Sequence, residues 1–344
     1  MNELLQQLTE AVGVSGAEHE VRALIRDLIA DHVDEWHVDT MGNLFALKKG
    51  TGESDLRVMV DAHMDEIGML VTQIDRDGSL NFLNIGGIND RTLPGKVVQI
   101  GAKKIRGVIG LKAIHLSRTS ERRSVPRADS LRIDIGASKK ESVRKVNVGD
   151  RVAFVSEYRE MGDIAMGKAF DDRAGCAVLV ELLRGEPFPF DLHAVFSVQE
   201  EVGLRGAEVA AYAVKPDVAL VLECTPALDI PYDEDVSTNL SLGQGPGVYV
   251  MDAYTFHDPR LVAHILKTGE KEGLPVQIRQ PGGGGTNAGA IQRATGPTPT
   301  VTIGLPGRYA HTPNMMISLQ DYANMVKLAD ASLRGLTRDV IQTD

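Results

Sequence analysis

The sequence predicts an α/β protein, specifically an α/β/α sandwich interrupted by a small all-β insertion. Helix-like and strand-like segments alternate over the first 67 residues and again after residue 167, which is typical of sheets covered by helices. Between residues 68 and 161, helical periodicity nearly disappears and short β-rich runs alternate with turns that contain glycine. A length of 344 residues suits roughly two domains. We therefore predict one domain from residues 1–67 and 162–344 and an inserted domain from residues 68–161.

The composition indicates a globular protein that binds neither nucleic acid nor membranes. Apolar residues make up 43% of the chain and charged residues 24%, as in soluble globular domains. The formal net charge of −10 disfavours nucleic acid as a partner, because phosphate backbones require a basic surface, and the one basic run, at 122–127, is short. The N-terminal segment lacks the features of a secretory signal, and no apolar run approaches the roughly 18 residues that span a bilayer. We expect a cytoplasmic protein.

Each element predicted in the first half of the chain has a local reason. The first residues have a helical pattern, and Ser15 to Glu18 resembles a capping box that would open a second helix. Apolar residues recur at helical spacing between 21 and 29, which gives this helix one buried face. Strands are predicted at 43–47 and 56–60, and the second is nearly all apolar, as expected of a central strand covered on both faces. Within the insertion, residues 139–145 are predicted to form one short helix.

The α/β alternation resumes after residue 167 and continues to the end of the chain. Helices are predicted at 173–184, 204–213, 259–272, 287–293 and 319–333, and strands at 192–198, 218–222, 248–251 and 300–304. No repeat, low-complexity tract or long linker separates these segments, so we expect them to form one sheet domain with residues 1–67.

Acidic and imidazole side chains gather where predicted strands end. His63 follows the strand at 56–60, Glu200 follows the strand at 192–198, and Glu223 directly follows the strand at 218–222. Ligands of open α/β sheets bind beyond the carboxyl ends of the strands, so we expect these side chains to converge at one edge. The candidates there are Asp61, His63, Asp65, Asp171, Asp172, Glu200, Glu201, Glu223 and His311. Two imidazoles with several carboxylates suit divalent zinc, cobalt or manganese, and a shared carboxylate can bridge two such ions.

Spacing alone leaves several roles at this edge open. Asp61 and Asp65 both share a strand face with His63, so either carboxylate can orient the imidazole ring. Asp171 and Asp172 can instead cap the helix that follows them, since a helix N-terminus favours negative charge.

Glu200 and Glu201 are adjacent acids, and such pairs usually form a solvated turn. Beside an apolar strand, however, their mutual repulsion would raise one pKa towards the range useful to a general base, while a metal keeps the other carboxylate ionised. The glycine run at 282–285 lacks the lysine of a phosphate-binding loop and follows no clear strand, so we expect it to form a backbone-lined substrate wall. Cys176 and Cys224 have no disulfide or zinc-finger spacing and are expected to be small buried residues.

Six motifs, taken in order, resemble the M42 family of metallo-aminopeptidases, which includes the glutamyl aminopeptidases and the TET peptidases. They are AHMDEIG (62–68), GKAFDDRAG (167–175), QEEVGLRGA (199–207), ECTPALDIP (223–231), GGGTNAGAIQ (283–292) and RYAHTP (308–313). The match covers nearly the whole chain. It implies that residues 68–161 are the family's PDZ-like dimerisation domain and that the remainder is the catalytic domain. It also implies homo-oligomers, either dimers or tetrahedral dodecamers.

The resemblance further implies a role for each site residue. His63, Asp171 and Glu223 would hold one metal ion, and Asp171, Glu201 and His311 would hold the other. Glu200 would be the general base, and Asp65 rather than Asp61 would orient His63. The residues expected to contact the substrate are Gly284, Gly285, Thr286, Asn287 and Arg308.

The function expected from this resemblance is removal of N-terminal residues from peptides by a dinuclear metal site, with zinc or cobalt favoured and manganese an alternative. The metal pair would acidify a bridging water, Glu200 would take its proton, and the resulting hydroxide would attack the peptide carbonyl. Two departures from the family pattern are Glu223 and Asn287, since many members carry Asp at both positions. One alternative function is a dinuclear deacylase or carboxypeptidase, because related enzymes of those kinds also use Glu at the position of Glu223. The other alternative is a catalytically silent assembly scaffold.

Overall fold

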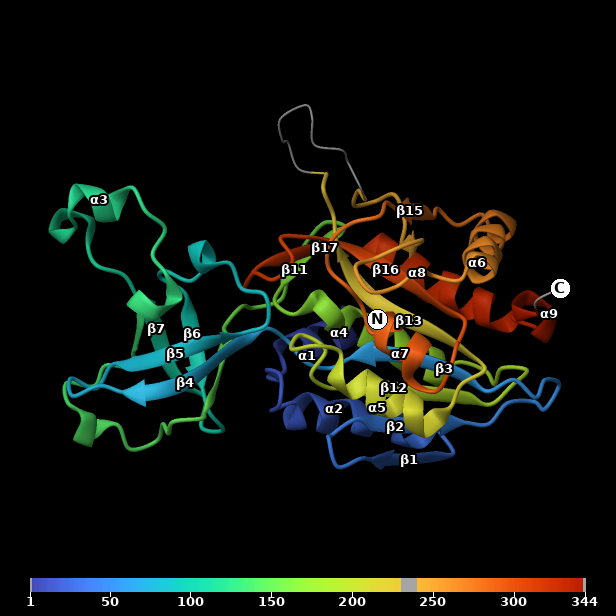
Figure 1. Cartoon of the computed structure of the whole chain (residues 1–344), viewed down its shortest axis with the longest axis horizontal. Coiled ribbons are helices and arrows are strands. Elements are labelled where there is room, and N and C mark those ends of the chain that lie inside the picture. Colours follow the sequence, from blue (N-terminus) through green and yellow to red (C-terminus); the bar gives the residue numbers. More distant parts are fainter. Residues whose placement is uncertain (1, 230–239, 343–344) are drawn as a thin grey trace.

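The computed structural model describes residues 2–229 and 240–342. Within these residues the chain forms a large mixed sheet covered by helices and, on the left in Figure 1, a separate closed β-barrel. The predicted fold class, an α/β sheet domain with an all-β insertion, is therefore confirmed. In the described part of the chain, no helix has the length and apolar character needed to cross a membrane.

The centre of the large sheet is parallel, and this places the ends of its main strands together. Four strands lie in the order β12 (Leu192–Ser197), β3 (Val58–His63), β13 (Val218–Pro226) and β16 (Thr300–Arg308), each parallel to its neighbour. Antiparallel strands extend the sheet on both sides. They are β2 (Leu44–Lys48) and β1 (Glu35–Val38) beyond β12, and β17 (Met315–Ser318), β11 (Ile164–Gly167) and β10 (Arg159–Met161) beyond β16. Two short strands, β14 (Gly247–Tyr249) and β15 (Gln277–Arg279), attach to β16 through β14.

Helices cover both faces of this sheet. One face carries α1 (Asn2–Glu10), α2 (His19–Ile29), α4 (Phe170–Arg184), α6 (Pro259–Glu272) and α8 (Leu319–Arg334). The other face carries α5 (Arg205–Val214) and α7 (Ala288–Ala294), and the short α9 (Arg338–Ile341) packs beside α6. The fully buried strand β3 serves both layers, because Val58 and Val60 join the core under the first group while Met59 joins the core under the second. This two-sided burial agrees with its nearly all-apolar sequence.

The inserted barrel has its own hydrophobic core. Its antiparallel strands close in the order β4 (Gly68–Ile74), β5 (Leu80–Ile85), β8 (Arg132–Asp134), β7 (Ile105–Gly110), β6 (Val97–Ile100) and β9 (Arg151–Phe154). The short helix α3 (Thr119–Arg122) lies on an excursion at its far end (Figure 1). The segment predicted as a helix at 139–145 is reduced to one 3-10 turn at Lys140–Ser142. Strand β10 already belongs to the large sheet, so the barrel itself ends at Phe154.

The predicted capping box at Ser15 is wrong. Helix α2 begins only at His19, and Glu18, the residue before it, makes no side-chain capping bond. The Ser15 hydroxyl instead donates a hydrogen bond of 2.6 Å to Oδ2 of Asp65, 50 residues further along the chain. The Ser15 hydroxyl, which the local pattern assigned to a helix cap, therefore bonds to Asp65 in a distant segment instead.

Candidate metal centre

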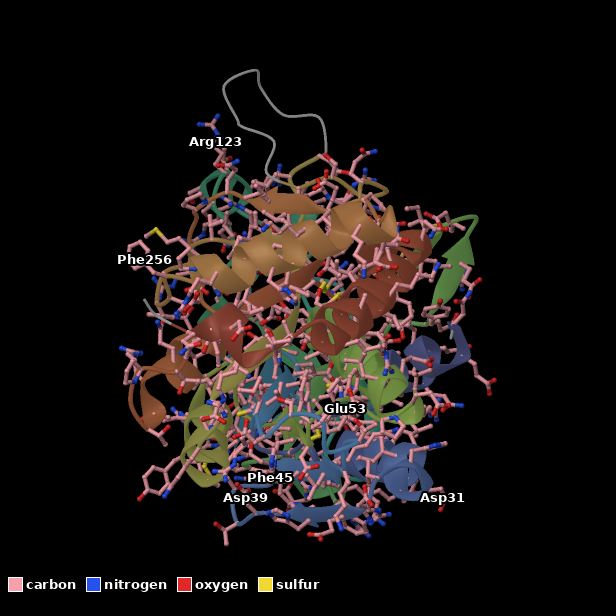
Figure 2. All side chains as sticks on the ribbon, turned by 90° about the vertical axis from the view of Figure 1, so that its right-hand side faces the viewer. Asp31, Asp39, Phe45, Glu53, Arg123 and Phe256 are labelled. Atoms are coloured by element: carbon pink, nitrogen blue, oxygen red, sulfur yellow. The ribbon has the colours of Figure 1, made fainter. Side chains whose placement is uncertain are left out.

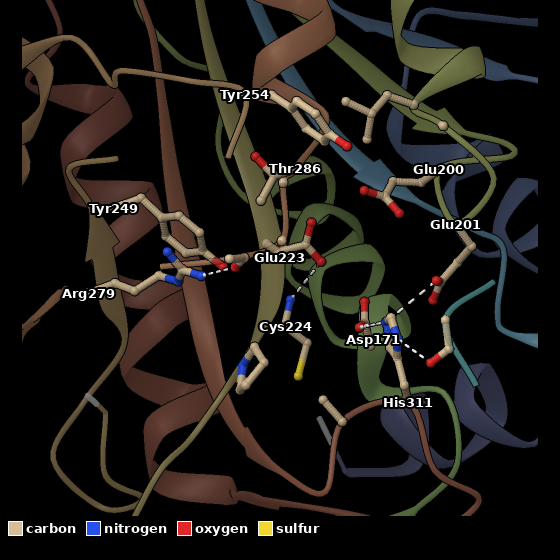
Figure 3. A pocket seen from close by; sticks show the side chains of 18 of the residues that line it. Asp171, Glu200, Glu201, Glu223, Cys224, Tyr249, Tyr254, Arg279, Thr286 and His311 are labelled. Carbon is tan, nitrogen blue, oxygen red and sulfur yellow. Dashed lines mark hydrogen bonds and ion pairs between the residues drawn. The ribbon is translucent and has the colours of Figure 1, made fainter. Parts of the chain in front are cut away.

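Polar side chains predicted at the sheet edge lie together at the carboxyl ends of the parallel strands, and Figure 3 shows Asp171, Glu200, Glu201, Glu223 and His311 among them. His63 is the last residue of β3, Glu200 and Glu201 lie in the turn after β12, and His311 lies in the loop after β16. Glu223 lies inside β13 rather than after it, because this strand continues to Pro226. Asp171 stands at the start of α4, where its backbone is not helical.

Two groups of possible metal ligands share one carboxylate. His63 Nε2 lies 3.2 Å from Oδ1 of Asp171 and 3.5 Å from Oε1 of Glu223. His311 Nε2 lies 3.3 Å from Oδ2 of Asp171 and 3.4 Å from Oε2 of Glu201. In each group the three ligand atoms lie within 4.8 Å of one another. Asp171 therefore turns one oxygen towards each group, which is the arrangement of a bridging carboxylate.

His63 and His311 both turn their Nε2 atom towards the centre. Nδ1 of His63 lies 3.2 Å from the backbone oxygen of Asp65 and 3.4 Å from its Oδ1, and Nδ1 of His311 lies 3.0 Å from the backbone oxygen of Gly87. A carbonyl oxygen can only accept, so each Nδ1 carries a hydrogen and each Nε2 is the nitrogen that a metal would bind in place of a proton. Of the two aspartates that spacing left open, Asp65 lies beside His63. Asp61 instead accepts from Asn287 and Ser197.

Asp65 also holds the turn that carries the adjacent glutamates. Its carboxylate accepts hydrogen bonds from the backbone amides of Glu200 at 2.9 Å and Glu201 at 3.2 Å, as well as the bond from Ser15. Burial raises the pKa of Asp65, but the hydrogen bond from His63 and the other donors outweigh burial and leave this pKa below its ordinary value. Asp65 is thus held as a carboxylate that orients both an imidazole and a loop.

Spacing left open whether Asp171 and Asp172 cap the helix that follows or face the metal centre, and in the structure each acid takes one of these two roles. Asp172 Oδ1 accepts from the backbone amide of Gly175 at 2.9 Å, three residues into the helical turn, and its Oδ2 accepts from the amide of His63 at 3.2 Å. Asp172 therefore caps α4 and ties it to β3. Asp171 is left to face both imidazoles.

The centre carries more negative charge than its protein partners neutralise. Burial raises the pKa of Glu201 to about 8 and that of Glu223 to about 7. Among residues 2–229 and 240–342, no lysine or arginine forms an ion pair with either group or with Asp171. Two Nε2 atoms among clustered carboxylates fit two divalent cations, which would replace the imidazole protons and supply the missing positive charge.

Glu200 belongs to neither ligand group. Its Oε2 lies 4.0 Å from His63 Nε2, and its side chain lines the pocket above the centre. Burial raises the pKa of Glu200 well above its ordinary value; attraction to His63 offsets part of this, and repulsion from Glu223 adds to it. A carboxyl group with a raised pKa beside a cation site is suited to accept and return a proton.

A pocket of about 740 Å³ opens above the centre. Gly284, Gly285 and Thr286 line it, and their role as a substrate wall stays a prediction. Figure 3 shows Tyr254 and Thr286 on the side that faces Glu200. The lining residues that lie outside the six motifs are Gly87, Asn89, Thr92, Tyr249, Tyr254 and Arg279, and sequence reasoning missed all of them. None of them belongs to a recognisable motif, although paired glycines after a barrel strand can signal a close backbone approach.

The last two predicted substrate residues point elsewhere. Asn287 donates from Nδ2 to Asp61 Oδ2 at 2.7 Å and to Ser197 Oγ at 2.9 Å, so its amide is used beneath the pocket. Arg308 forms a two-pronged ion pair with Asp229 at 2.6 and 2.7 Å and is absent from the pocket lining. Ile230 and Pro231, the end of the motif that begins at Glu223, lie outside the described residues.

The sheet with its inserted barrel and the cluster around Asp171 together define a class of protein, the metallopeptidases. The sequence model of the M42 glutamyl aminopeptidase family matches residues 42–328, so the chain belongs to this family. The resemblance drawn from the six motifs is confirmed, and the protein is an aminopeptidase of this family.

Individual relatives match over nearly their whole length. The chain is 33% identical to the lysyl aminopeptidase of Pyrococcus furiosus, with 97% of each chain covered. It is similar in structure to the aminopeptidase APDkam598 of Desulfurococcus kamchatkensis, with a TM-score of 0.93, 36% identity and coverage of 99% of this chain and 96% of that one. The Pyrococcus horikoshii TET1 peptidase, which assembles into a tetrahedron or a large octahedral shell, has a TM-score of 0.86 and 32% identity, with 97% and 99% covered.

Proposed function

We propose that this protein is a dinuclear metal-dependent aminopeptidase that removes N-terminal residues from peptides. The observation that carries the proposal is the pair of ligand groups that share Asp171, directly beneath a pocket into which Glu200 projects. His63, Asp171 and Glu223 would hold one divalent cation, and Asp171, Glu201 and His311 the other. Zinc or cobalt suits this mixture of imidazole and carboxylate, and manganese is an alternative.

Glu200 is the proposed general base. When bound, a pair of divalent cations supplies an acidified water and a Lewis acid for the peptide carbonyl. The Glu200 carboxylate takes a proton from the attacking water and later gives it to the leaving amine, so one group serves as base and then as acid. Asp65 holds the backbone amide of Glu200 and thus fixes the position from which it acts.

The pocket favours a substrate with a free α-amino group. Its floor is lined by the carboxylates of Asp171, Glu200, Glu201 and Glu223. With Asp171, Glu201 and Glu223 engaged as ligands, the free α-amino group would bind one of the cations or the nearby acid Glu200. The glycine wall at Gly284 and Gly285 leaves room for the peptide to approach the backbone. Asn287 and Arg308, expected to touch the substrate, are proposed instead to support this wall and the end of β16 from beneath.

The requirement for a free amine separates this proposal from its closest rival. Hydrolysis of an aminoacyl chromogenic substrate panel is compared with hydrolysis of the same compounds after N-acetylation, before and after chelation and metal add-back. Cleavage of only the free amines, lost on chelation and restored by cobalt or zinc, supports the aminopeptidase. Preferential cleavage of the N-acyl compounds would support a deacylase.

Glu200→Gln tests the assigned base. This variant should keep two metal ions per chain, because Glu200 is not a ligand, while kcat falls by about 10²–10⁴-fold. Metal content measured on the purified variant separates loss of the base from loss of the centre. Wild-type turnover in Glu200→Gln would remove Glu200 from the mechanism.

We further propose that residues 68–161 mediate homo-oligomerisation. The barrel exposes apolar side chains on the excursion that carries α3, with Leu111 at 56%, Ile114 at 71% and Leu116 at 64% exposure. An exposed apolar group of this kind is typical of an interaction surface. Dimers, assembled further into a tetrahedral shell like that of the TET1 relative, are the proposed form.

A further inference from the structure

The second ligand group is completed by a segment that does not belong to the sheet domain. The turn after β5 of the inserted barrel brings Gly87 against His311, and its carbonyl oxygen lies 3.0 Å from Nδ1 of the ring. Gly87, Asn89 and Thr92 also line the pocket. The barrel therefore forms one wall of the catalytic centre.

His311 depends on this contact more than His63 depends on any single neighbour. It stands in a loop with φ of +58°, an uncommon conformation for a residue with a side chain, and its side chain is 38% exposed. His63 is the last residue of the buried strand β3, and its side chain is 2% exposed. Packing within the sheet domain and the contact with Asp65 thus both hold the ring of His63. The direction of the His311 ring towards Asp171 and Glu201 is set mainly by the carbonyl of Gly87.

The close approach requires that the turn carry no side chains. A Cβ added to Gly87 would lie 2.9 Å from Nδ1 and 3.3 Å from Cε1 of His311, with no other described neighbour within 4 Å. A Cβ on Gly86 would lie 2.7 Å from Cγ2 of Ile67 and 3.0 Å from Oε2 of Glu201, and Gly86 has a φ of +79° that side chains disfavour. Each glycine therefore packs against a different ligand of the same group.

We infer that Gly86 and Gly87 of the inserted barrel position His311 and Glu201 and thereby set the affinity of the second cation site. This inference rests on the two-cation centre proposed above. The first site, made of His63, Asp171 and Glu223, is built entirely within the sheet domain. A shift of the barrel against the sheet would consequently alter one cation site and leave the other intact.

The variant Gly87→Ala tests this directly. The backbone of Gly87 lies outside the left-handed region, so the added methyl group meets only the His311 ring. Metal-free protein is titrated with cobalt and followed by calorimetry and by the visible absorption of the bound ion. Wild type should show two binding steps, and Gly87→Ala should weaken one of them by about 10–100-fold, the usual effect of disturbing a ligand's outer partner. His311→Ala identifies which step belongs to the second site.

Gly110→Ala is the matched control within the barrel. Its Cβ would lie 3.5 Å from the backbone oxygen of Arg132, which is ordinary contact, so both steps should keep wild-type affinity. Thermal unfolding in chelator checks that both alanine variants are folded to the same degree. Two unchanged steps in Gly87→Ala, or equal weakening of both, would overturn the inference. If wild type takes up no cobalt, the proposed centre itself fails and the inference falls with it.

Discussion

Asp61 is a buried carboxyl group behind the metal centre. Its hydrogen-bond partners are the amide of Asn287 and the hydroxyl of Ser197. Its Oδ2 accepts from Asn287 at 2.7 Å and from Ser197 at 3.3 Å, and its Oδ1 has no hydrogen-bond partner among the described residues. Burial raises the pKa of Asp61 from 3.8 to about 7, and the bonds from Asn287 and Ser197 oppose this only in part. An ionised Asp61 is therefore costly for the folded state.

This raised pKa predicts a pH-dependent stability. Between about pH 4 and pH 7 the folded chain keeps a proton on Asp61 that the unfolded chain has lost, so its contribution to the free energy of unfolding falls as pH rises through this window. Asp61→Asn removes the titration. The free energy of unfolding of Asp61→Asn relative to wild type should therefore rise by roughly 2–4 kcal/mol from pH 4 to pH 7.

Urea unfolding of metal-free protein across this pH range measures the effect. Asp31→Asn, at an exposed position at the lower right of Figure 2, is the control for the same substitution on the surface. A difference between Asp61→Asn and wild type that stays constant with pH would contradict the assignment.

The site residues differ in how far sequence could predict them. His63 and Glu200 follow apolar strands, and strand ends of a parallel sheet converge, so local patterns place them at one edge. Tyr249, Tyr254 and Arg279 line the pocket only because β14, the loop that follows it and β15, which pairs with β14, are brought beside β16. That packing joins segments with no local signal, so their roles emerge only from the tertiary structure.

At the scale of elements, a buried ionic cluster ties three segments behind the site. Lys168 Nζ lies 2.8 and 2.7 Å from the two carboxylate oxygens of Glu66, and Arg173 Nη2 lies 3.4 Å from Oε1. Arg173 also donates to the backbone oxygens of Leu8 and Met64. The cluster therefore joins α1, the connection after β3 and the start of α4, which carries the proposed bridging ligand.

Glu66→Gln should destabilise the fold substantially. The change keeps the shape of the side chain but leaves Lys168 and Arg173 buried without a counter-charge, which costs about 3–5 kcal/mol in comparable buried pairs. Chemical denaturation measures this loss. Glu53→Gln, on the surface in Figure 2, should change the free energy of unfolding by less than about 0.5 kcal/mol. Equal stability of the two variants would show that the cluster does not stabilise the fold.

Element boundaries were predictable where capping residues act locally. Helix α6 has the predicted bounds, because Asp258 accepts from the amide of Arg260, Pro259 suits the first turn and Gly273 takes the left-handed conformation at the end. Helix α2 starts later than predicted because Ser15 bonds to Asp65 in another segment. Local chemistry thus specifies a boundary only when no distant partner competes for the same group.

At the scale of the whole molecule, the two bodies carry opposite charge. Residues 68–161 contain 18 lysines and arginines against 10 acids, whereas the rest of the chain contains 19 against 37. The all-β character of the insertion was predictable from its short β-rich runs and turns. Its strand order was not, because β8 pairs with both β5 and β7 across loops that carry no pairing signal.

The exposed apolar excursion predicts how assembly can be broken. Replacing both Ile114 and Leu116 with glutamate should leave the barrel folded, because both side chains are exposed, yet shift the molecular mass towards monomer. Sedimentation analysis measures the mass. Phe256→Glu, a 75% exposed site on the sheet domain (Figure 2), is the matched control and should keep the wild-type mass. If only Phe256→Glu dissociated, the contact between copies of the chain would lie on the sheet domain rather than on the barrel.

The stoichiometry of bound metal tests the shared-ligand centre most directly. Metal-free wild type, dialysed against cobalt or zinc, should bind two ions per chain. Asp171→Asn should weaken both, Glu223→Gln mainly the first and Glu201→Gln mainly the second, because only Asp171 belongs to both ligand groups. A wild-type chain that binds one ion or none, or an Asp171→Asn variant that keeps both at full affinity, would contradict the account.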